Sequence, residues 1–276
     1  MELIIILMEI KFLGEFSNSK LEGFGVYYYS TGGRYEGEFK NLTKEGYGID
    51  YYPDGRRYEG GYKNNLREGY GLLYYLDGRF EGNYKNDLRV GFGIIHYSNG
   101  DIYKGEFKNN LREGHGTLYY SSGGKYVGEF KNDLREGYGI LYYSSGGKDE
   151  GEFKNDIFEG YGIYYYSNGD IYEGEIKNYK CEGYGKCYFI NGDRYEGTFS
   201  NGYNIGYGIF YSILGIKYES YFKPGIYSWI LFSIYKILLF LDHLRDIFIN
   251  NKISLLFIVI LIIGIILNWI LSNNFI

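Results

Sequence analysis

A block of 23 residues recurs along most of this chain. The glycine that closes each Tyr-Glu-Gly or equivalent triplet falls at Gly14, Gly37, Gly60, Gly82, Gly105, Gly128, Gly151, Gly174 and Gly197. Consecutive members lie 23 residues apart, except for one step of 22. A period of this length predicts a repeat architecture in which each unit packs on its neighbours. The repeats form one array over residues 11–223, with nine copies and a degenerate tenth in which Ser220 replaces the glycine.

Each copy predicts two short β-strands. In residues 34–40, RYEGEFK, every second side chain points to the same face of an extended chain. Apart from its glycines and Asp50, the stretch at residues 46–52, GYGIDYY, consists of aromatic and β-branched residues, which strands favour. Turn sequences rich in Asn, Asp and Gly separate the strands, and the whole chain has only two prolines. The pattern therefore predicts an all-β repeat array built as a meander of hairpins.

Glycine in the middle of a strand normally weakens it, so the recurring glycines need a physical reason. Gly37 and its equivalents sit mid-strand, next to an aromatic residue two positions earlier. A ring that lies flat over bare backbone requires the missing side chain of glycine. We therefore expect each copy to pair one aromatic ring with one strand glycine.

The motif YEGEFKN, followed by EGYGI and a glycine-containing turn, resembles the MORN (membrane occupation and recognition nexus) repeat over about three quarters of the chain. The resemblance implies an elongated, twisted, single-layer antiparallel sheet with an aromatic-lined groove. Members of this family bind acidic phospholipids, act as scaffolds or self-associate, and junctophilins join such an array to a carboxyl-terminal membrane helix. Asp149, Val90, His96 and His115 depart from the pattern, and the Asp149 copy is expected to be looser.

Two sets of residues are candidates for binding. The aromatic groove would be lined by Tyr35, Phe39, Tyr58, Tyr62, Tyr103, Phe107, Tyr126, Phe130, Tyr172, Tyr195 and Phe199. A row of lysines, called the lysine row below, would stack into a stripe for acidic lipid, and consists of Lys40, Lys63, Lys85, Lys108, Lys131, Lys154 and Lys177. Glutamates such as Glu38, Glu106 and Glu129 share the face of this row. A solvated, self-neutralised face is therefore the alternative to a lipid site.

Charge narrows the range of partners. Residues 1–222 carry 25 basic and 32 acidic side chains, a net charge of −7. Nucleic-acid binding relies on basic surfaces that neutralise phosphates, so nucleic acid is not an expected partner. The same acidity weakens the case for acidic phospholipid, because anionic headgroups attract basic surfaces. We expect a protein partner or a homo-oligomer instead, and acidic phospholipid remains an alternative.

The residues do not indicate an enzyme. The chain has three histidines, of which His96 and His115 take aromatic positions in different copies. One carboxylate in every copy does not build a single catalytic pocket, and GYGID lacks both the third glycine and the following helix of a nucleotide-binding loop. Cys181 and Cys187 have no metal-ligand spacing and fit a reducing compartment. We expect no catalytic residue, no metal and no cofactor.

Residues 253–271, ISLLFIVILIIGIILNWIL, contain no charged side chain. As a helix they would span about 28 Å, close to the roughly 30 Å of bilayer hydrocarbon. The segment predicts a transmembrane helix, and its anchoring positions include Ile253, Leu256, Ile260, Ile263, Leu267 and Leu271.

Residues 224–252 are predicted to form an amphipathic or membrane-associated helix. Their apolar stretch at 226–241 is interrupted by Lys236, and three arrangements remain open: a helix along the interface, a second span, or a helix docked over the sheet. The aromatic residues and Lys236 favour the interfacial helix.

Residues 1–10 predict an extra strand that caps the first edge of the array, since they lack the basic start and long apolar stretch of a signal peptide. The array is then expected in the cytosol, on the endoplasmic reticulum rather than the outer mitochondrial membrane. The expected function is a non-enzymatic, membrane-anchored scaffold or tether, junctophilin-like in layout, with an array on the order of 85 Å long. The alternatives are a module that binds acidic phospholipid and an accessory subunit that localises a separate enzyme.

Overall fold

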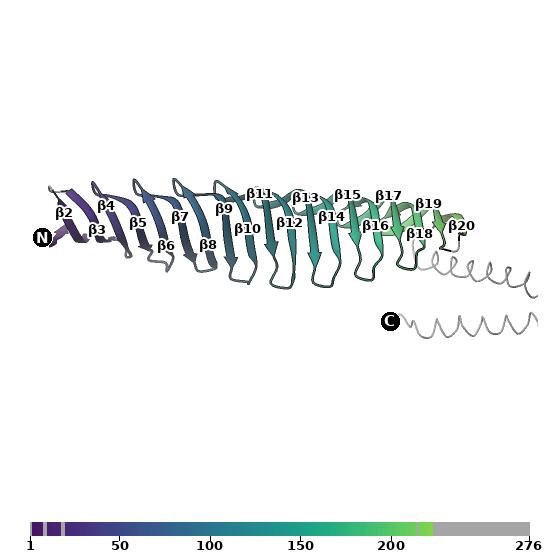
Figure 1. Cartoon of the computed structure of the whole chain (residues 1–276), viewed down its shortest axis with the longest axis horizontal. Helices are drawn as coiled ribbons and strands as arrows, with labels where there is room; N and C mark the ends of the chain where they lie inside the picture. Colours follow the sequence, from purple (N-terminus) through teal and green to yellow (C-terminus); the bar gives the residue numbers. More distant parts are fainter. Residues whose placement is uncertain (1, 8–9, 18–19, 214, 223–276) are drawn as a thin grey trace, which may run out of the picture.

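A computed structural model describes most of the repeat array (Figure 1). The described residues are 2–7, 10–17, 20–213 and 215–222. The helices predicted at 224–252 and 253–271, including all six anchoring positions, lie outside the described residues.

The described residues form one antiparallel sheet, in which each strand pairs with the next along the chain (Figure 1). The strands are β1 (Glu2–Leu7), β2 (Ile10–Ser17), β3 (Lys20–Tyr28), β4 (Arg34–Lys40), β5 (Thr43–Tyr51), β6 (Arg57–Lys63), β7 (Leu66–Tyr75), β8 (Gly78–Lys85), β9 (Leu88–Tyr97), β10 (Ile102–Lys108), β11 (Leu111–Tyr119), β12 (Gly124–Lys131), β13 (Leu134–Tyr143), β14 (Lys148–Lys154), β15 (Ile157–Tyr165), β16 (Ile171–Lys177), β17 (Lys180–Tyr188), β18 (Arg194–Ser200), β19 (Tyr203–Tyr211) and β20 (Lys217–Phe222). The predicted all-β antiparallel meander is confirmed. β1 pairs with β2 at the start of the sheet.

The turns at one edge of the sheet explain why the copies carry Asn followed by Asn or Asp. Asn86 and Asp87, between β8 and β9, have φ angles of 48° and 66°. Two consecutive positive φ angles define the tight hairpin turn that suits the twist of paired strands, and Asn and Asp tolerate this conformation best. Leu42 and Tyr179 take the second position of the turn in two copies, with φ angles of 67° and 58°.

The mid-strand glycines lie directly under aromatic rings. Gly105 in β10 faces Gly116 in β11, and the ring of Tyr103 covers both. A Cβ on Gly105 would lie 2.3 Å from the Tyr103 hydroxyl oxygen and 2.6 Å from the Cα of Gly116. The Tyr103 hydroxyl also donates a hydrogen bond to the Glu106 carbonyl at 3.2 Å. The predicted pairing of ring and glycine is confirmed, and one ring covers a glycine on each of two strands.

These rings form a continuous core on one face of the sheet, called the inner face. Tyr103 meets Phe107 of its own copy and Phe130 of the next copy edge to face, with ring centroids 5.3 and 5.0 Å apart. The same contact links successive rings from Tyr35 to Phe153 at 5.0–5.4 Å. Edge-to-face pairs contribute about 0.5–1.5 kcal/mol each beyond the burial of their area. Each copy is therefore packed on its neighbours through aromatic contacts.

Arginines cover these rings and join neighbouring copies. The guanidinium carbon of Arg112 lies 5.4 Å from the ring centroid of Tyr103 and 5.2 Å from that of Phe130. Its Nε lies 3.3 Å from a carboxylate oxygen of Asp133, in the turn of the next copy. The equivalent residues Arg67 and Arg135 make the same ion pair one turn onward. This arginine row, which the sequence analysis did not identify, stabilises both the rings and the spacing of the turns.

In the copy that carries Asp149, the ring over the glycines comes from a different position. Phe158, in β15, stands where Arg112 and Arg135 stand in their copies, and its ring lies over the glycines Gly151 and Gly162. Phe158 is 0 % exposed, so the space that Asp149 leaves empty is filled. Asp149 accepts a hydrogen bond from the Tyr143 hydroxyl, and burial raises the pKa of its carboxyl group to about 6. The copy expected to be looser is therefore repacked around a different ring.

The ring-over-glycine contact predicts the effect of a side chain at Gly105. Gly105→Val should destabilise the array by about 1–3 kcal/mol, because the added methyl groups clash with the Tyr103 ring and with strand β11. Urea unfolding of the full chain, followed by tyrosine fluorescence, measures this loss. Lys108→Val in the same strand is the control, since Lys108 is exposed. Equal stability of the two variants would contradict the contact.

The exchange of rings in the Asp149 copy can be tested by a double-mutant cycle. Asp149→Tyr should destabilise the array, because its ring and that of Phe158 compete for the space over Gly151 and Gly162. Adding Phe158→Arg restores the residues of the other copies and should recover most of the loss, with a coupling of roughly 1–3 kcal/mol. Thermal unfolding of the full chain measures all four forms. Additive losses in the double variant would show that the two positions do not share one ring site.

Candidate interaction surface

The residues predicted to line an aromatic groove form the core. All eleven are between 0 and 6 % exposed. They are held by edge-to-face contacts, and five of them also lie under arginines, so they do not present their rings to a ligand. The candidate groove is corrected accordingly: these positions build the array, and a binding surface has to be sought on its other face.

The opposite face, called the outer face, carries a row of exposed aromatic side chains. Their exposed fractions range from 52 to 63 %, and the row consists of Phe24, Tyr47, Tyr70, Phe92, Tyr138, Tyr161, Tyr184 and Tyr207. His115, also exposed, takes the equivalent position in one copy. Each residue of this exposed aromatic row stands between two glycines. The second of these glycines faces the core, and alternation along a strand therefore directs the aromatic residue before it outward.

Many of these outer tyrosines are held in place by hydrogen bonds to glutamates. The Tyr47 hydroxyl donates to a carboxylate oxygen of Glu59 at 2.6 Å, and Tyr161 donates to Glu173 at 2.9 Å. The same pair occurs between Tyr138 and Glu150, Tyr70 and Glu81, and Tyr207 and Glu219. The hydrogen bond from Tyr47 is the largest of the causes that lower the pKa of Glu59. The outer face thus combines fixed aromatic rings with ionised carboxylates.

Basic side chains on the outer face are paired with a second set of tyrosines. The guanidinium carbon of Arg34 lies 3.9 Å from the centroid of the Tyr51 ring, and the ammonium nitrogen of Lys148 lies 4.1 Å from that of Tyr165. Cation–π contacts at exposed sites contribute about 0.5–1 kcal/mol each. Arg34 also contacts the carboxylate of Glu36. Positive charge on this face is therefore partly neutralised where it occurs.

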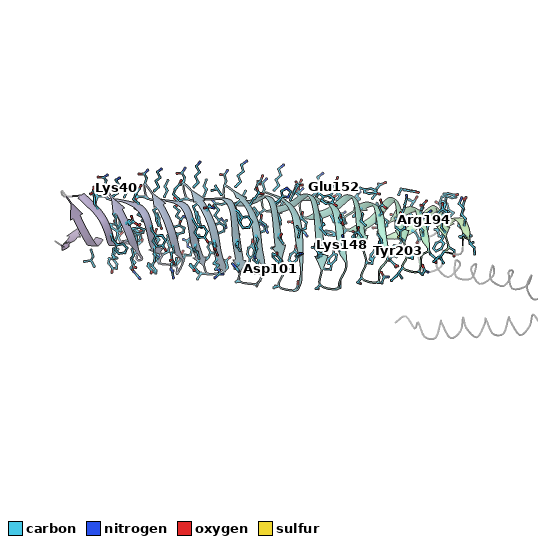
Figure 2. All side chains as sticks on the ribbon, viewed as in Figure 1. Lys40, Asp101, Lys148, Glu152, Arg194 and Tyr203 are labelled. Carbon is cyan, nitrogen blue, oxygen red and sulfur yellow. The ribbon has the colours of Figure 1, made fainter. Side chains whose placement is uncertain are left out.

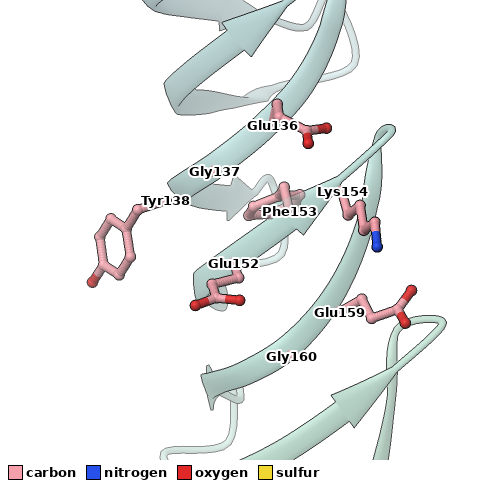
Figure 3. A pocket seen from close by; sticks show the side chains of 8 residues that line it. All are labelled: Glu136, Gly137, Tyr138, Glu152, Phe153, Lys154, Glu159 and Gly160. Atoms are coloured by element: carbon pink, nitrogen blue, oxygen red, sulfur yellow. The ribbon is translucent and has the colours of Figure 1, made fainter.

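The lysine row follows one long edge of the sheet, where Lys40 is labelled in Figure 2. All seven lysines are exposed, and none forms an ion pair within the described part of the chain. Lys154 shares a depression of about 490 Å³ with Glu136, Glu152 and Glu159 (Figure 3). Glu136 is fixed there, because it accepts a hydrogen bond from the Asn155 backbone N–H at 2.9 Å. Acidic residues outnumber lysine at this point of the row.

The described residues contain no group of three His, Cys, Asp or Glu side chains that could hold a metal ion. Cys181 is buried and Cys187 half-buried, and both are free thiols. Burial raises the pKa of Cys181 to about 11 and that of Cys187 to about 12, which disfavours their reactive thiolate forms. Within the described ranges, no helix is long and apolar enough to cross a membrane.

The solved structures that match this chain share little sequence identity with it. The TCP10 domain of Danio rerio CPAP, in complex with a peptide of Danio rerio STIL, is 9 % identical, with a TM-score of 0.43 over 80 % of this chain and 100 % of that chain. The TCP domain of Drosophila melanogaster SAS-4, in complex with a proline-rich motif of Ana2, is 14 % identical, with a TM-score of 0.37 over 63 % of this chain and 88 % of that chain. No curated protein matches the chain.

The MORN repeat model matches eight segments that together cover well over half of the chain. They are residues 12–34, 35–55, 58–78, 80–102, 103–125, 126–148, 150–171 and 172–194. The structure continues the pattern beyond the last match, since the ring of Tyr195 covers Gly197 and Gly208 as in the earlier copies. Matching motifs, spacing and strand pairing lead to one conclusion: the chain belongs to the MORN repeat family.

Proposed function

We propose that this chain is a non-enzymatic scaffold that binds protein through the outer face of its sheet. The observation that carries the proposal is the exposed aromatic row, whose members are more than half exposed along the length of the array. The core on the inner face is complete without these side chains. Exposed aromatic surfaces mark interaction sites, and tyrosine supplies a large contact area with a polar tip.

The charge of the outer face favours protein over acidic lipid. Tyr47, Tyr138 and Tyr161 each hold a glutamate beside them, so a flat anionic surface would meet carboxylates along with rings. The lysine row is exposed, but Lys154 lies among three glutamates. Acidic phospholipid therefore remains the second candidate, supported by the lysine row alone. Localisation of a separate enzyme is one form that the scaffold role could take.

We further propose that residues 253–271 hold the scaffold in a membrane, with the array in the cytosol at the endoplasmic reticulum. The support comes from the sequence, where 19 residues carry no charged side chain and are long enough to cross the hydrocarbon region. An elongated array fixed at one end to a membrane would act as a tether for whatever its outer face binds.

Protein binding and lipid binding depend on different residues, so substitutions can distinguish the two functions. With the full chain in neutral nanodiscs, binding to liposomes of phosphatidylserine should be weak at physiological salt. Cross-linking in cells should join the outer face to protein, either a partner or a second copy. A variant with Tyr47→Ser, Tyr161→Ser and Tyr184→Ser should show fewer of these cross-links. A variant with Lys108→Gln and Lys131→Gln should show as many as the parent chain. Tight, salt-sensitive liposome binding that is lost in the lysine variant would make the lipid module the better proposal.

The membrane orientation has its own test. Protease added outside intact microsomes should digest the array, because the proposal places it on the cytosolic side. Asn41 offers an internal reporter, since it is exposed in a turn and begins the glycosylation triplet Asn-Leu-Thr. Protection of the array, or a glycan on Asn41, would place the array in the lumen.

A further inference from the structure

A line of alternating aliphatic and acidic side chains crosses the outer face from strand to strand. Glu59 in β6 faces Leu72 in β7, which in turn faces Glu81 in β8. Cross-strand partners continue this line as Glu36, Ile49, Glu59, Leu72, Glu81, Ile94, Lys104, Thr117, Val127, Ile140, Glu150, Ile163 and Glu173. Most of the charged side chains in this line are therefore acidic.

The line is interrupted in the middle of the array. Lys104 and Val127 stand where most other copies have glutamate, so no carboxylate occurs in the line between Glu81 and Glu150. The outer tyrosines that would bond to these two positions are also absent, because Phe92 and His115 take their places in the preceding copies. Two Tyr–Glu hydrogen bonds are thereby missing together. We call Phe92, Lys104, His115 and Val127 the central window.

The central window is apolar and accessible, with a positive charge inside it. Phe92 is 59 % exposed and Val127 is 37 % exposed. Lys104 is exposed and forms no ion pair within the described residues, and its nearest aromatic contact is the Tyr119 ring at 5.7 Å. Phe92 has no hydroxyl group that could bond to a carboxylate. Its ring is therefore less restrained than that of Tyr161, which is hydrogen-bonded to Glu173.

The charged neighbours of the window leave Lys104 available. On one side, Arg79 lies 3.3 Å from a ring nitrogen of His96, and Lys125 lies over the Tyr142 ring at 5.1 Å. On the other side, Glu106 is the cross-strand partner of Phe92 and accepts a hydrogen bond from the backbone N–H of His115 at 3.4 Å. The carboxylate of Glu106 is thus directed to the backbone of the adjacent strand. The window presents a positive charge at a place where the neighbouring copies present carboxylates.

We propose that the central window docks a protein segment that carries an apolar side chain next to a carboxylate. The apolar side chain packs on Phe92 and Val127, and the carboxylate pairs with Lys104. This inference rests on the proposed protein-binding function and assigns it a place and a partner chemistry. Two copies joined window to window by a two-fold axis would bring Lys104 against its counterpart, so a symmetric pair of this chain does not fit.

The test uses a variant in which the four residues of the central window are replaced by the tyrosine and glutamate found at these positions in most other copies. Phe92→Tyr, Lys104→Glu, His115→Tyr and Val127→Glu together restore two Tyr–Glu pairs, so the variant should melt no lower than the parent chain. The probe is a fluorescein-labelled peptide of alternating leucine and aspartate, added to the full chain in neutral nanodiscs. Fluorescence anisotropy should show at least a roughly tenfold weaker affinity for the variant.

Two controls separate the window from the rest of the array. Lys63→Glu reverses the charge of one exposed lysine at the edge of the sheet and should leave peptide affinity unchanged. A peptide with asparagine in place of aspartate should bind the parent chain as weakly as the original peptide binds the variant. A parent chain that binds the aspartate peptide no better than the variant does, or no better than it binds the asparagine peptide, would overturn the proposal.

Cellular cross-linking distinguishes failure of this inference from failure of the proposed function. If the variant keeps the cross-links of the parent chain, the partner binds elsewhere on the outer face, and the window proposal falls while the scaffold function stands. If the parent chain itself shows no protein cross-links on its outer face, the scaffold function falls, and the window proposal falls with it.

Discussion

The stacking of one aromatic ring over two facing glycines is the contact on which the whole array depends. A single-layer sheet has no second layer to bury its side chains, so a core has to be made on one face alone. Tyr103 achieves this by lying flat over Gly105 and Gly116, where any Cβ would clash. Edge-to-face contacts then link the rings of successive copies. The Asp149 copy shows how strict the requirement is, because Phe158 fills the ring site that Asp149 leaves empty.

A core confined to the inner face leaves the outer face free for interaction. The residue before each ring-covered glycine is directed outward by the same alternation that directs that glycine inward. Tyr47 and its equivalents consequently remain more than half exposed and are held in place by glutamates. The structural contact therefore positions the candidate surface: one repeat motif supplies packing on one side and a regular aromatic row on the other. Local departures from the motif, such as Lys104 and Val127, can then alter the surface without disturbing the core.

The sequence predicted the period, the strand pairs, the turns and the ring-over-glycine contact, because each depends on residues close together in one copy. It assigned the wrong role to Tyr35 and the other rings of the core, since alternation separates two faces without telling which face is covered. The arginine row was missed because its contacts join different copies: Arg112 lies over rings from two copies and forms an ion pair with Asp133 in the following turn. The exchange between Asp149 and Phe158 was missed for a similar reason: the two positions lie on neighbouring strands and share one space only after the hairpin forms.

The central claim is that one set of tyrosines forms the core and another forms an accessible surface. Hydroxyl-radical footprinting of the full chain, resolved residue by residue, tests it directly. The account predicts rapid oxidation of Tyr47, Tyr161 and Tyr184, and protection of Tyr58 and Tyr126 until the array is unfolded. Comparable oxidation of both sets in the folded chain would contradict it. Protection of the outer set, lost when a bound protein is removed, would place the partner on the outer face.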